Sequence, residues 1–192
     1  MNILILNGAP LNGRGAAHII IRKAIENESA ARGLNVTAFD LAGMDIKPCH
    51  GCFACWLKHP GVCAIRDDQE NVLRAMAASD VVVWTTPVTF GGYSSELKKA
   101  LDRFIPNLLP FFALVKGEVH HPHRYVRMRK LMVLGTLPVP SPDSEKVFRM
   151  LVDRNALNMH STNTQVALLR EDAVETGIQH AVKELFEKAE VL

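Results

Sequence analysis

Residues 80–86, DVVVWTT, form the stretch that decides the fold, because they contain the unbroken apolar run Val81-Val82-Val83-Trp84. Successive side chains of a strand point to opposite faces of its sheet, so an unbroken apolar run needs cover on both sides. A parallel sheet between two helical layers gives that cover, since its crossover helices lie on both faces. The run therefore predicts a central strand of an α/β protein.

Outward from this strand, β-branched and leucine-rich segments alternate with segments of helical spacing. Such alternation implies right-handed crossovers and a three-layer α/β sandwich with a five-stranded parallel sheet, order 2-1-3-4-5. That order places ligand sites beyond the ends of the first and third strands. The expected strands are 1–7, 35–41, 80–86, 130–137 and 163–169. The expected helices are 15–31, 67–78, 94–104, 143–155 and 171–190.

Length and composition indicate one domain over residues 1–192. The chain is 48% hydrophobic and 22% charged with a net charge of +2, which excludes a disordered chain and gives no field that would attract nucleic acid or a membrane surface. No basic segment precedes the first apolar run, and no eighteen apolar residues follow one another. We therefore expect a cytoplasmic protein whose partners are small molecules or other proteins.

The loop after the first strand, residues 7–15 (NGAPLNGRG), leads into a helix N-terminus. Free N–H groups and the helix dipole favour an anion there, and glycines allow its close approach, so a phosphate is the expected ligand. A glycine-rich turn without a ligand is the alternative. The candidate binding residues are Gly8, Ala9, Pro10, Asn12, Gly13, Arg14 and Gly15.

The loop after the third strand carries the more specific motif, Pro-x-x-Phe-Gly-Gly-x-Ser-x-x-Leu-Lys-x-x-x-Asp-Arg over residues 87–103. Ser94 or Ser95 is placed to cap the following helix. The glycine pair lets the backbone lie flat against a planar ligand. The candidate binding residues are Pro87, Val88, Thr89, Phe90, Gly91 and Gly92.

This motif, after a buried third strand, resembles the flavin loop of the NAD(P)H-dependent FMN reductases of the flavodoxin-like superfamily. The resemblance is strong over residues 1–105. It implies a flavodoxin-like sandwich in which the first loop holds the FMN phosphate and the second contacts the isoalloxazine ring. It further implies an oxidoreductase that uses NAD(P)H, needs no catalytic side chain and forms a homodimer or homotetramer.

The first loop departs from the family pattern, which reads Gly-Ser-Pro-Arg followed by a glycine and a hydroxyl pair. Here Ala9, Leu11, Ala16 and Ala17 replace donors that are each worth ~1 to 3 kcal/mol to a charged phosphate. Weakened FMN affinity follows, and a scaffold that has lost its cofactor is one rival hypothesis. A non-catalytic electron carrier or regulatory flavin-binding module is the other, although carriers of the flavodoxin branch tend to be acidic.

All cysteines of the chain lie within fifteen residues, spaced Cys49-x2-Cys52-x2-Cys55-x7-Cys63. In a reducing compartment such crowding indicates metal or redox chemistry. The motif resembles that of the iron–sulfur flavoproteins, a branch of the same superfamily, and so implies a [4Fe-4S] cluster held by these four residues. Zinc and free thiols remain the alternatives. Phe53 and Trp56 in the same loop either shield a cluster or anchor the loop.

Two long irregular stretches, residues 42–66 and 106–129, separate the expected elements, and the second contains three histidines, His120, His121 and His123. Neighbouring histidines of a strand face opposite ways and Pro122 breaks helical spacing, so a metal site is disfavoured. We expect these residues, with Tyr125, in a lid or subunit contact beside the flavin. Residues 104–115 form either an apolar dimerisation patch or ordinary core.

Overall fold

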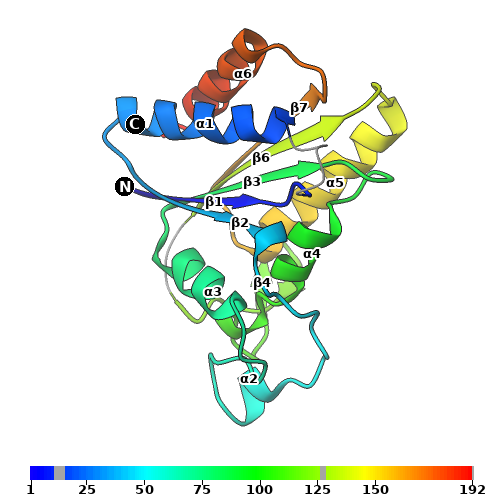
Figure 1. Cartoon of the computed structure of the whole chain (residues 1–192). Coiled ribbons are helices and arrows are strands. Elements are labelled where there is room, and N and C mark those ends of the chain that lie inside the picture. Colours follow the sequence, from blue (N-terminus) through cyan, green and yellow to red (C-terminus); the bar gives the residue numbers. More distant parts are fainter. Residues whose placement is uncertain (11–15, 126–128, 192) are drawn as a thin grey trace.

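The computed structural model describes residues 1–10, 16–125 and 129–191. Its centre is a five-stranded sheet, seen near edge-on in Figure 1, with the order β2-β1-β3-β6-β7 and parallel pairing throughout. When β4 and β5, which form a separate two-stranded sheet, are left out of the count, this is the predicted order 2-1-3-4-5. The strands are β1 (Asn2–Asn7), β2 (Asn35–Asp40), β3 (Val81–Pro87), β6 (Lys130–Leu137) and β7 (Asn163–Arg170).

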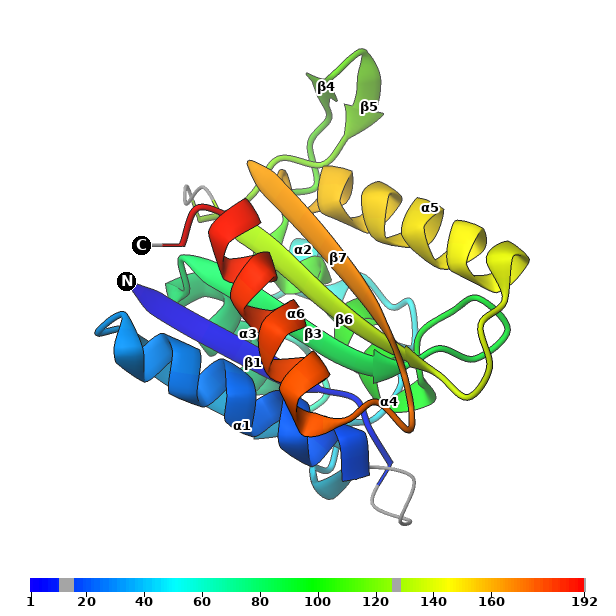
Figure 2. The same ribbon diagram turned by 90° about the horizontal axis from the view of Figure 1, so that it is seen from above.

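Helices cover both faces of the sheet, as Figure 2 shows from above. Val81 and Val83 of β3 pack among α1 and α6 on one face, whereas Val82 and Trp84 pack among α3, α4 and α5 on the other. All four side chains are buried, so the two-sided burial predicted for residues 80–86 is confirmed. The helices are α1 (Ala16–Ala31), α3 (Gln69–Ala78), α4 (Ser95–Asp102), α5 (Pro142–Asn158) and α6 (Glu175–Lys188).

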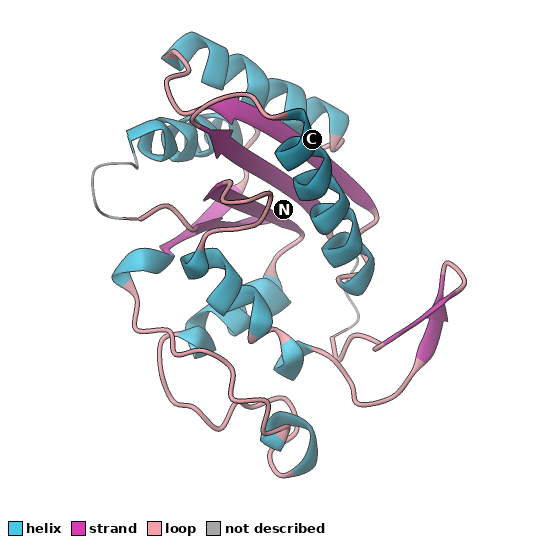
Figure 3. Cartoon of the chain, turned by 90° about the vertical axis from the view of Figure 1, so that its right-hand side faces the viewer, coloured by secondary structure: helices cyan, strands magenta, loops and turns pink. Residues whose placement is uncertain are grey.

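The two long irregular stretches, residues 42–66 and 106–129, contain short helices and strands that the sequence does not predict. A four-residue helix, α2 (Ala54–Leu57), lies in the cysteine loop, between the short 3-10 turn η1 (Leu41–Gly43) and α3. A hairpin of β4 (Ala113–Val115) and β5 (Glu118–His120) follows the 3-10 turn η2 (Ile105–Asn107) and projects from the body, as Figure 3 shows. Within the described residues, no helix has the length and apolar character that crossing a membrane requires.

Candidate functional site

The carboxyl ends of the central strands meet at one edge, where the loops after β1 and β3 lie together. The N–H of Gly8 donates to the Thr85 carbonyl at 2.8 Å, and the N–H of Val88 donates to the Thr136 carbonyl at 2.8 Å. The sheet pairing therefore continues into both loops and fixes their backbones. We call residues 7–10 and 86–94 the strand-end site.

Ser94 joins the two loops directly. Its hydroxyl donates to the Gly8 carbonyl at 2.6 Å and accepts the N–H of Leu97 at 3.2 Å, so it is also the N-cap of α4, as predicted. The loops approach so closely that a Cβ on Gly8 would lie 2.7 Å from both the Leu97 Cβ and the Ser94 Oγ. Gly8 is thus required for packing between the loops.

The loop after β3 ends in a tight turn that presents an aromatic side chain to solvent. Thr89 and Gly92 exchange main-chain hydrogen bonds of 3.0 and 2.8 Å across it. Phe90 has a φ of 50° and is 100% exposed. A bulky residue in this left-handed conformation is strained, and such strain is concentrated at ligand sites. Gly91 has a φ of 76°, and a Cβ there would lie 2.8 Å from a Val147 methyl group.

The loop after β1 uses its first N–H groups internally. Besides the Gly8 bond to β3, the N–H of Ala9 donates to the Asn7 side chain at 3.1 Å, and Pro10 has no N–H. Residues 8–10 therefore offer no free main-chain N–H to a phosphate. The predicted binding residues Asn12, Gly13, Arg14 and Gly15 lie outside the described residues.

His18 is a buried group beside this edge that the sequence analysis did not identify. Its Nε2 lies 2.9 Å from the Thr136 hydroxyl, and its buried Nδ1 has no hydrogen-bond partner among the residues that the structure describes. Burial lowers the pKa of His18 to about 4, so the ring is neutral at pH 7. Only its place on the inner face of α1 could have signalled this role, because a lone histidine in a helix has no motif.

All four cysteines line one small cavity, together with Arg103, Ile105 and Pro106. Cys49 and Cys52 are exposed at the surface, Cys55 is buried and Cys63 is intermediate. Burial raises the pKa of the Cys55 thiol, and the neighbouring Cys63 raises it further. Residues that are fourteen apart in the sequence thus come together, as the motif predicts. We call this cavity and its lining residues the cysteine site.

The cysteine loop is anchored to the body by an aromatic side chain. The indole N–H of Trp56 donates to the carbonyls of Ile105 and Leu108 at 3.1 and 3.0 Å. Its ring stacks on Phe53 with centroids 5.4 Å apart, and Phe53 remains substantially exposed. Trp56 therefore anchors the loop, whereas Phe53 lines the same cavity as the four cysteines.

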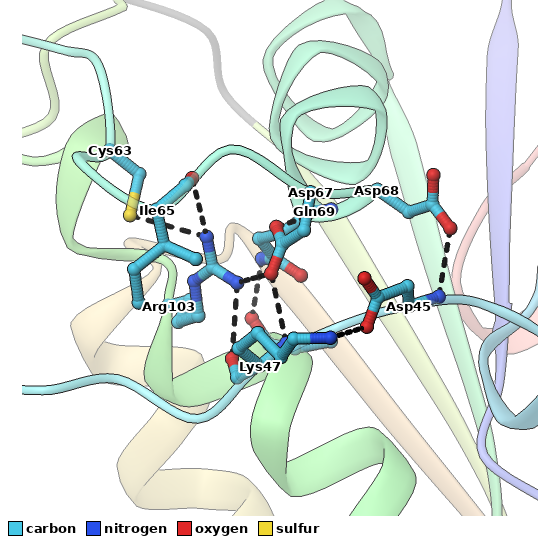
Figure 4. A network of polar contacts seen from close by, with 9 residues as sticks. Asp45, Lys47, Cys63, Ile65, Asp67, Asp68, Gln69 and Arg103 are labelled. Atoms are coloured by element: carbon cyan, nitrogen blue, oxygen red, sulfur yellow. Dashed lines mark hydrogen bonds and ion pairs between the residues drawn. The ribbon is translucent and has the colours of Figure 1, made fainter.

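A buried ion pair closes the other side of the cysteine site (Figure 4). The guanidinium of Arg103 pairs with the carboxylate of Asp67, and both side chains are 1% exposed. Arg103 also donates to the Cys63 Sγ at 3.2 Å and to the carbonyls of Ile65 and Lys47 at 3.2 and 3.0 Å. One arginine at the end of α4 thereby holds three separate points of the cysteine loop.

Asp67 has a different role from the one expected of it. The sequence predicts Asp67 at the start of a helix, but α3 begins at Gln69 and the carboxylate points to Arg103 (Figure 4). Burial by itself raises the pKa of Asp67, but the bonds from Arg103 and from the N–H groups of Lys47 and Gln69 outweigh it and lower the pKa below its ordinary value. Asp67 is therefore ionised.

Four thiols are a donor set that both an iron–sulfur cluster and zinc accept. Among the described residues, no three His, Cys, Asp or Glu side chains are grouped so that they could hold one metal ion. Zinc needs its ligands together at about 2.3 Å from one centre, whereas the thiolates of an iron–sulfur cluster bind different irons. Two N–H groups already point at sulfur, from Gly51 to Cys49 at 3.5 Å and from Arg103 to Cys63.

The histidines of residues 106–129 contact the amino-terminal side of the sheet, so they form no lid over the strand-end site of the same chain. Their predicted place in a subunit contact stays a prediction. His120 contacts the Asn158 side chain at 2.9 Å, and His123 lies 3.0 Å from Arg129, just before β6 begins. The His123 ring packs on His160 at the end of α5. These contacts belong to the amino-terminal edge of the sheet. The chain reaches this edge of the sheet through the projecting hairpin of β4 and β5, which ends at His120.

The fold and the strand-end site define an α/β protein of the flavodoxin-like class. The chain belongs to the NADPH-dependent FMN reductase family, whose model matches residues 1–172. Two solved structures share the fold. An NAD(P)H:quinone oxidoreductase from Methanothermobacter marburgensis has a TM-score of 0.72, 12% identity and 96% of each chain covered. An FMN-dependent NADH-azoreductase from Bacillus anthracis has a TM-score of 0.66, 14% identity, and 99% and 98% covered.

Curated relatives of similar sequence are iron–sulfur flavoproteins. One from Methanocaldococcus jannaschii is 33% identical over 111 residues, which cover 58% of this chain and 55% of the relative. One from Archaeoglobus fulgidus is 35% identical over 103 residues, which cover 54% and 48%. The chain thus spans about half the length of the curated relatives it matches.

Proposed function

We propose that the chain is an FMN-dependent oxidoreductase of the iron–sulfur flavoprotein type, which takes electrons from NAD(P)H or a protein donor and passes them to a small-molecule or protein acceptor. The observation that carries the proposal is the convergence of all four cysteines on one cavity in a chain of the FMN reductase family. A plain flavodoxin-like carrier does not account for that convergence.

The strand-end site is the proposed flavin site. FMN, when bound, takes a hydride from the nicotinamide and releases its electrons singly. The turn at Thr89, Phe90, Gly91 and Gly92 would set the exposure of the ring, with the preceding Pro87 and Val88 fixed by the sheet. The phosphate would lie at the N-terminus of α1, held by donors that follow Pro10. No side chain need act as acid or base.

The cysteine site is the proposed cluster site, with Cys49, Cys52, Cys55 and Cys63 as ligands. A [4Fe-4S] cluster, when bound, gains and loses single electrons. The cavity between the thiols is about 20 Å³, so a cluster requires the exposed loop with Cys49 and Cys52 to lie further out. α4 joins the two sites: Ser94 and Arg103 are nine residue steps apart, which at 1.5 Å each span roughly 14 Å.

A homodimer or homotetramer is the proposed assembly. Phe111, Phe112 and Leu114 beside and within the hairpin are 65%, 73% and 77% exposed, which is costly for a monomer in water. Sedimentation of the wild type against a variant with all three changed to Ser tests this. A lower mass for the variant is expected, and an unchanged mass would place the interface elsewhere.

The spectrum of the anaerobically purified chain, with analysis of flavin, iron and sulfide, tests both cofactors. We expect bound FMN and about four irons per chain. Cys52→Ser should remove the broad visible band of the cluster and leave the flavin. The chain has no fifth cysteine that could replace Cys52 as a ligand. Turnover of NADH or NADPH with an artificial acceptor separates an enzyme from a carrier. Persistence of the broad band in Cys52→Ser would reject the ligand assignment.

A further inference from the structure

We propose that Arg103 is a positioning residue that tunes the cluster couple: its buried charge and its N–H bond to the Cys63 sulfur favour the reduced state. This inference rests on the proposed function, because it concerns the cluster of that same site. It goes beyond ligand assignment, since Arg103 is not a ligand and acts through Cys63.

The geometry of Arg103 suits an anionic sulfur. A neutral thiol is a weak acceptor, whereas a thiolate accepts a charge-assisted hydrogen bond from a guanidinium. Cysteine binds iron as the thiolate. The guanidinium divides its donors between the two sides: one terminal nitrogen bonds to Asp67 and the Lys47 carbonyl, and the other bonds to Cys63 and the Ile65 carbonyl. The side facing Cys63 therefore carries positive charge toward the cavity.

Burial makes this charge effective. Arg103 and Asp67 are both 1% exposed, so water screens their fields little. Hydrogen bonds to sulfur, net charge and solvent exposure are the factors that set iron–sulfur potentials. Reduction of a bound cluster would take one electron from the reduced flavin without forming or breaking a bond of the protein. The guanidinium of Arg103 would then stabilise the added negative charge.

Substitution of Asp67 should shift the cluster couple in the direction opposite to substitution of Arg103. Its carboxylate lies against Arg103 on the side away from Cys63 and offsets part of the positive charge at the cavity (Figure 4). Removing the positive charge should disfavour reduction, and removing the negative charge should favour it. A loop that is merely loosened would instead respond in the same direction to both substitutions, because each breaks the same pair.

The experiment is a redox titration of the anaerobically purified full chain with dithionite, followed by EPR for the cluster and by absorbance for the flavin. Arg103→Gln should lower the equilibrium constant of one-electron cluster reduction about tenfold, which is about 59 mV for a one-electron couple. Arg103→Lys, which keeps the charge but not the planar fork, should give a smaller decrease. Asp67→Asn should give an increase.

Arg66→Gln is the matched control. Arg66 lies three residues from Cys63, and its substitution removes the same unit charge as Arg103→Gln. Its side chain, however, is 65% exposed and screened by water. We expect a change below about threefold. The flavin couple should stay unchanged in every variant, since Arg103 lies at the far end of α4.

Iron and sulfide analysis separates the two possible failures. A wild type without iron and sulfide overturns the cluster of the proposed function. A wild type with a full cluster, whose couple does not move in Arg103→Gln or moves in the same direction as in Asp67→Asn, overturns the role of Arg103 alone. Where Arg103→Gln does not fold, Arg103→Lys and Asp67→Asn still decide, because they must shift the couple in opposite directions.

Discussion

The strand-end site and the cysteine site are held in place by different means. At the strand-end site, main-chain bonds of Gly8 and Val88 extend the sheet into the loops, and Ser94 links the loops to each other. At the cysteine site, an irregular loop depends on Trp56 and on the buried pair of Arg103 with Asp67. A sheet edge shares its stability among many weak bonds, whereas a buried ion pair leaves an uncompensated charge when one partner is lost. The cysteine site should therefore be the more fragile.

The largest expected effect is that of Arg103→Met. The substitution leaves Asp67 buried without its partner, which costs about 3–5 kcal/mol of the free energy of unfolding. Urea denaturation at pH 7 measures it. Lys98→Met is the control on the same helix, because its pair with Asp102 is half-exposed and should cost no more than about 1 kcal/mol. Equal losses in the two variants would show that the cysteine site does not depend on the buried pair.

At the strand-end site, Gly8→Ala should have the next largest effect. The added methyl group would meet Leu97 and Ser94 at 2.7 Å, and such overpacking costs roughly 1–3 kcal/mol. FMN affinity should fall as well, because the two loops would be forced apart. Gly43→Ala, with open space around its Cβ, is the control and should change little. Isothermal titration with FMN measures the affinity, and urea denaturation measures the free energy of unfolding. A Gly8→Ala variant with normal values of both would contradict the packing argument.

The two sites should also differ in their response to pH. The unfolded chain binds a proton at His18 below about pH 6.5 and the folded chain only below about 4, so unfolding takes up a proton and stability falls as the pH drops from 6.5 toward 4. Asp67, whose pKa is lowered in the folded chain, contributes stability that is lost only as the pH falls below its ordinary value of 3.8.

Unfolding at pH 7 and pH 5 measures this difference. His18→Gln should reduce the loss between the two pH values by roughly 1 to 2 kcal/mol. The part that remains is expected from His123, where burial likewise lowers the pKa to about 4, and from His160, whose pKa burial also lowers. Asp67→Asn should leave the loss between pH 7 and pH 5 unchanged. A steeper dependence in His18→Gln than in the wild type would show that His18 is not held neutral.

The smallest effect on stability is expected for Phe90→Gly. Relief of the left-handed conformation should more than offset the extra entropy of glycine, for a gain of roughly 0.5 kcal/mol. FMN should bind more weakly if the exposed ring covers the flavin. Phe53→Gly relieves the same conformation at the cysteine site, where φ is 52°, and should leave FMN affinity unchanged. Equal affinities of both variants would remove Phe90 from the flavin site.

The sheet and its order were predictable, because they follow from local patterns. The apolar run at 80–86 and the alternation of strands with helices leave few possible arrangements. The hairpin of β4 and β5 was not predictable in the same way: its strands have three residues each, and Leu114 and Val119 are exposed, so no alternation marks them. A short exposed hairpin lacks the periodic signal on which prediction from sequence depends.

The candidate sites show the same limit. The cysteines could be predicted as a group because their spacing is local. The pairing of Arg103 with Asp67 spans 36 residues, and each residue alone has a common explanation, as part of a motif or as a helix-start acid. The histidines were placed at the wrong edge of the sheet for a related reason, since only the path of the hairpin determines which end of α5 they meet.

The length of α4 has a consequence for the history of the chain. Its first residues are fixed by Ser94 at one site and its last by Arg103 at the other. Inserting a single residue between them would turn the two ends by about 100° relative to each other, since a helix has 3.6 residues per turn. Either the serine or the arginine would then face away from its partners. Insertions and deletions should therefore accumulate in the surrounding loops and spare these eight residues.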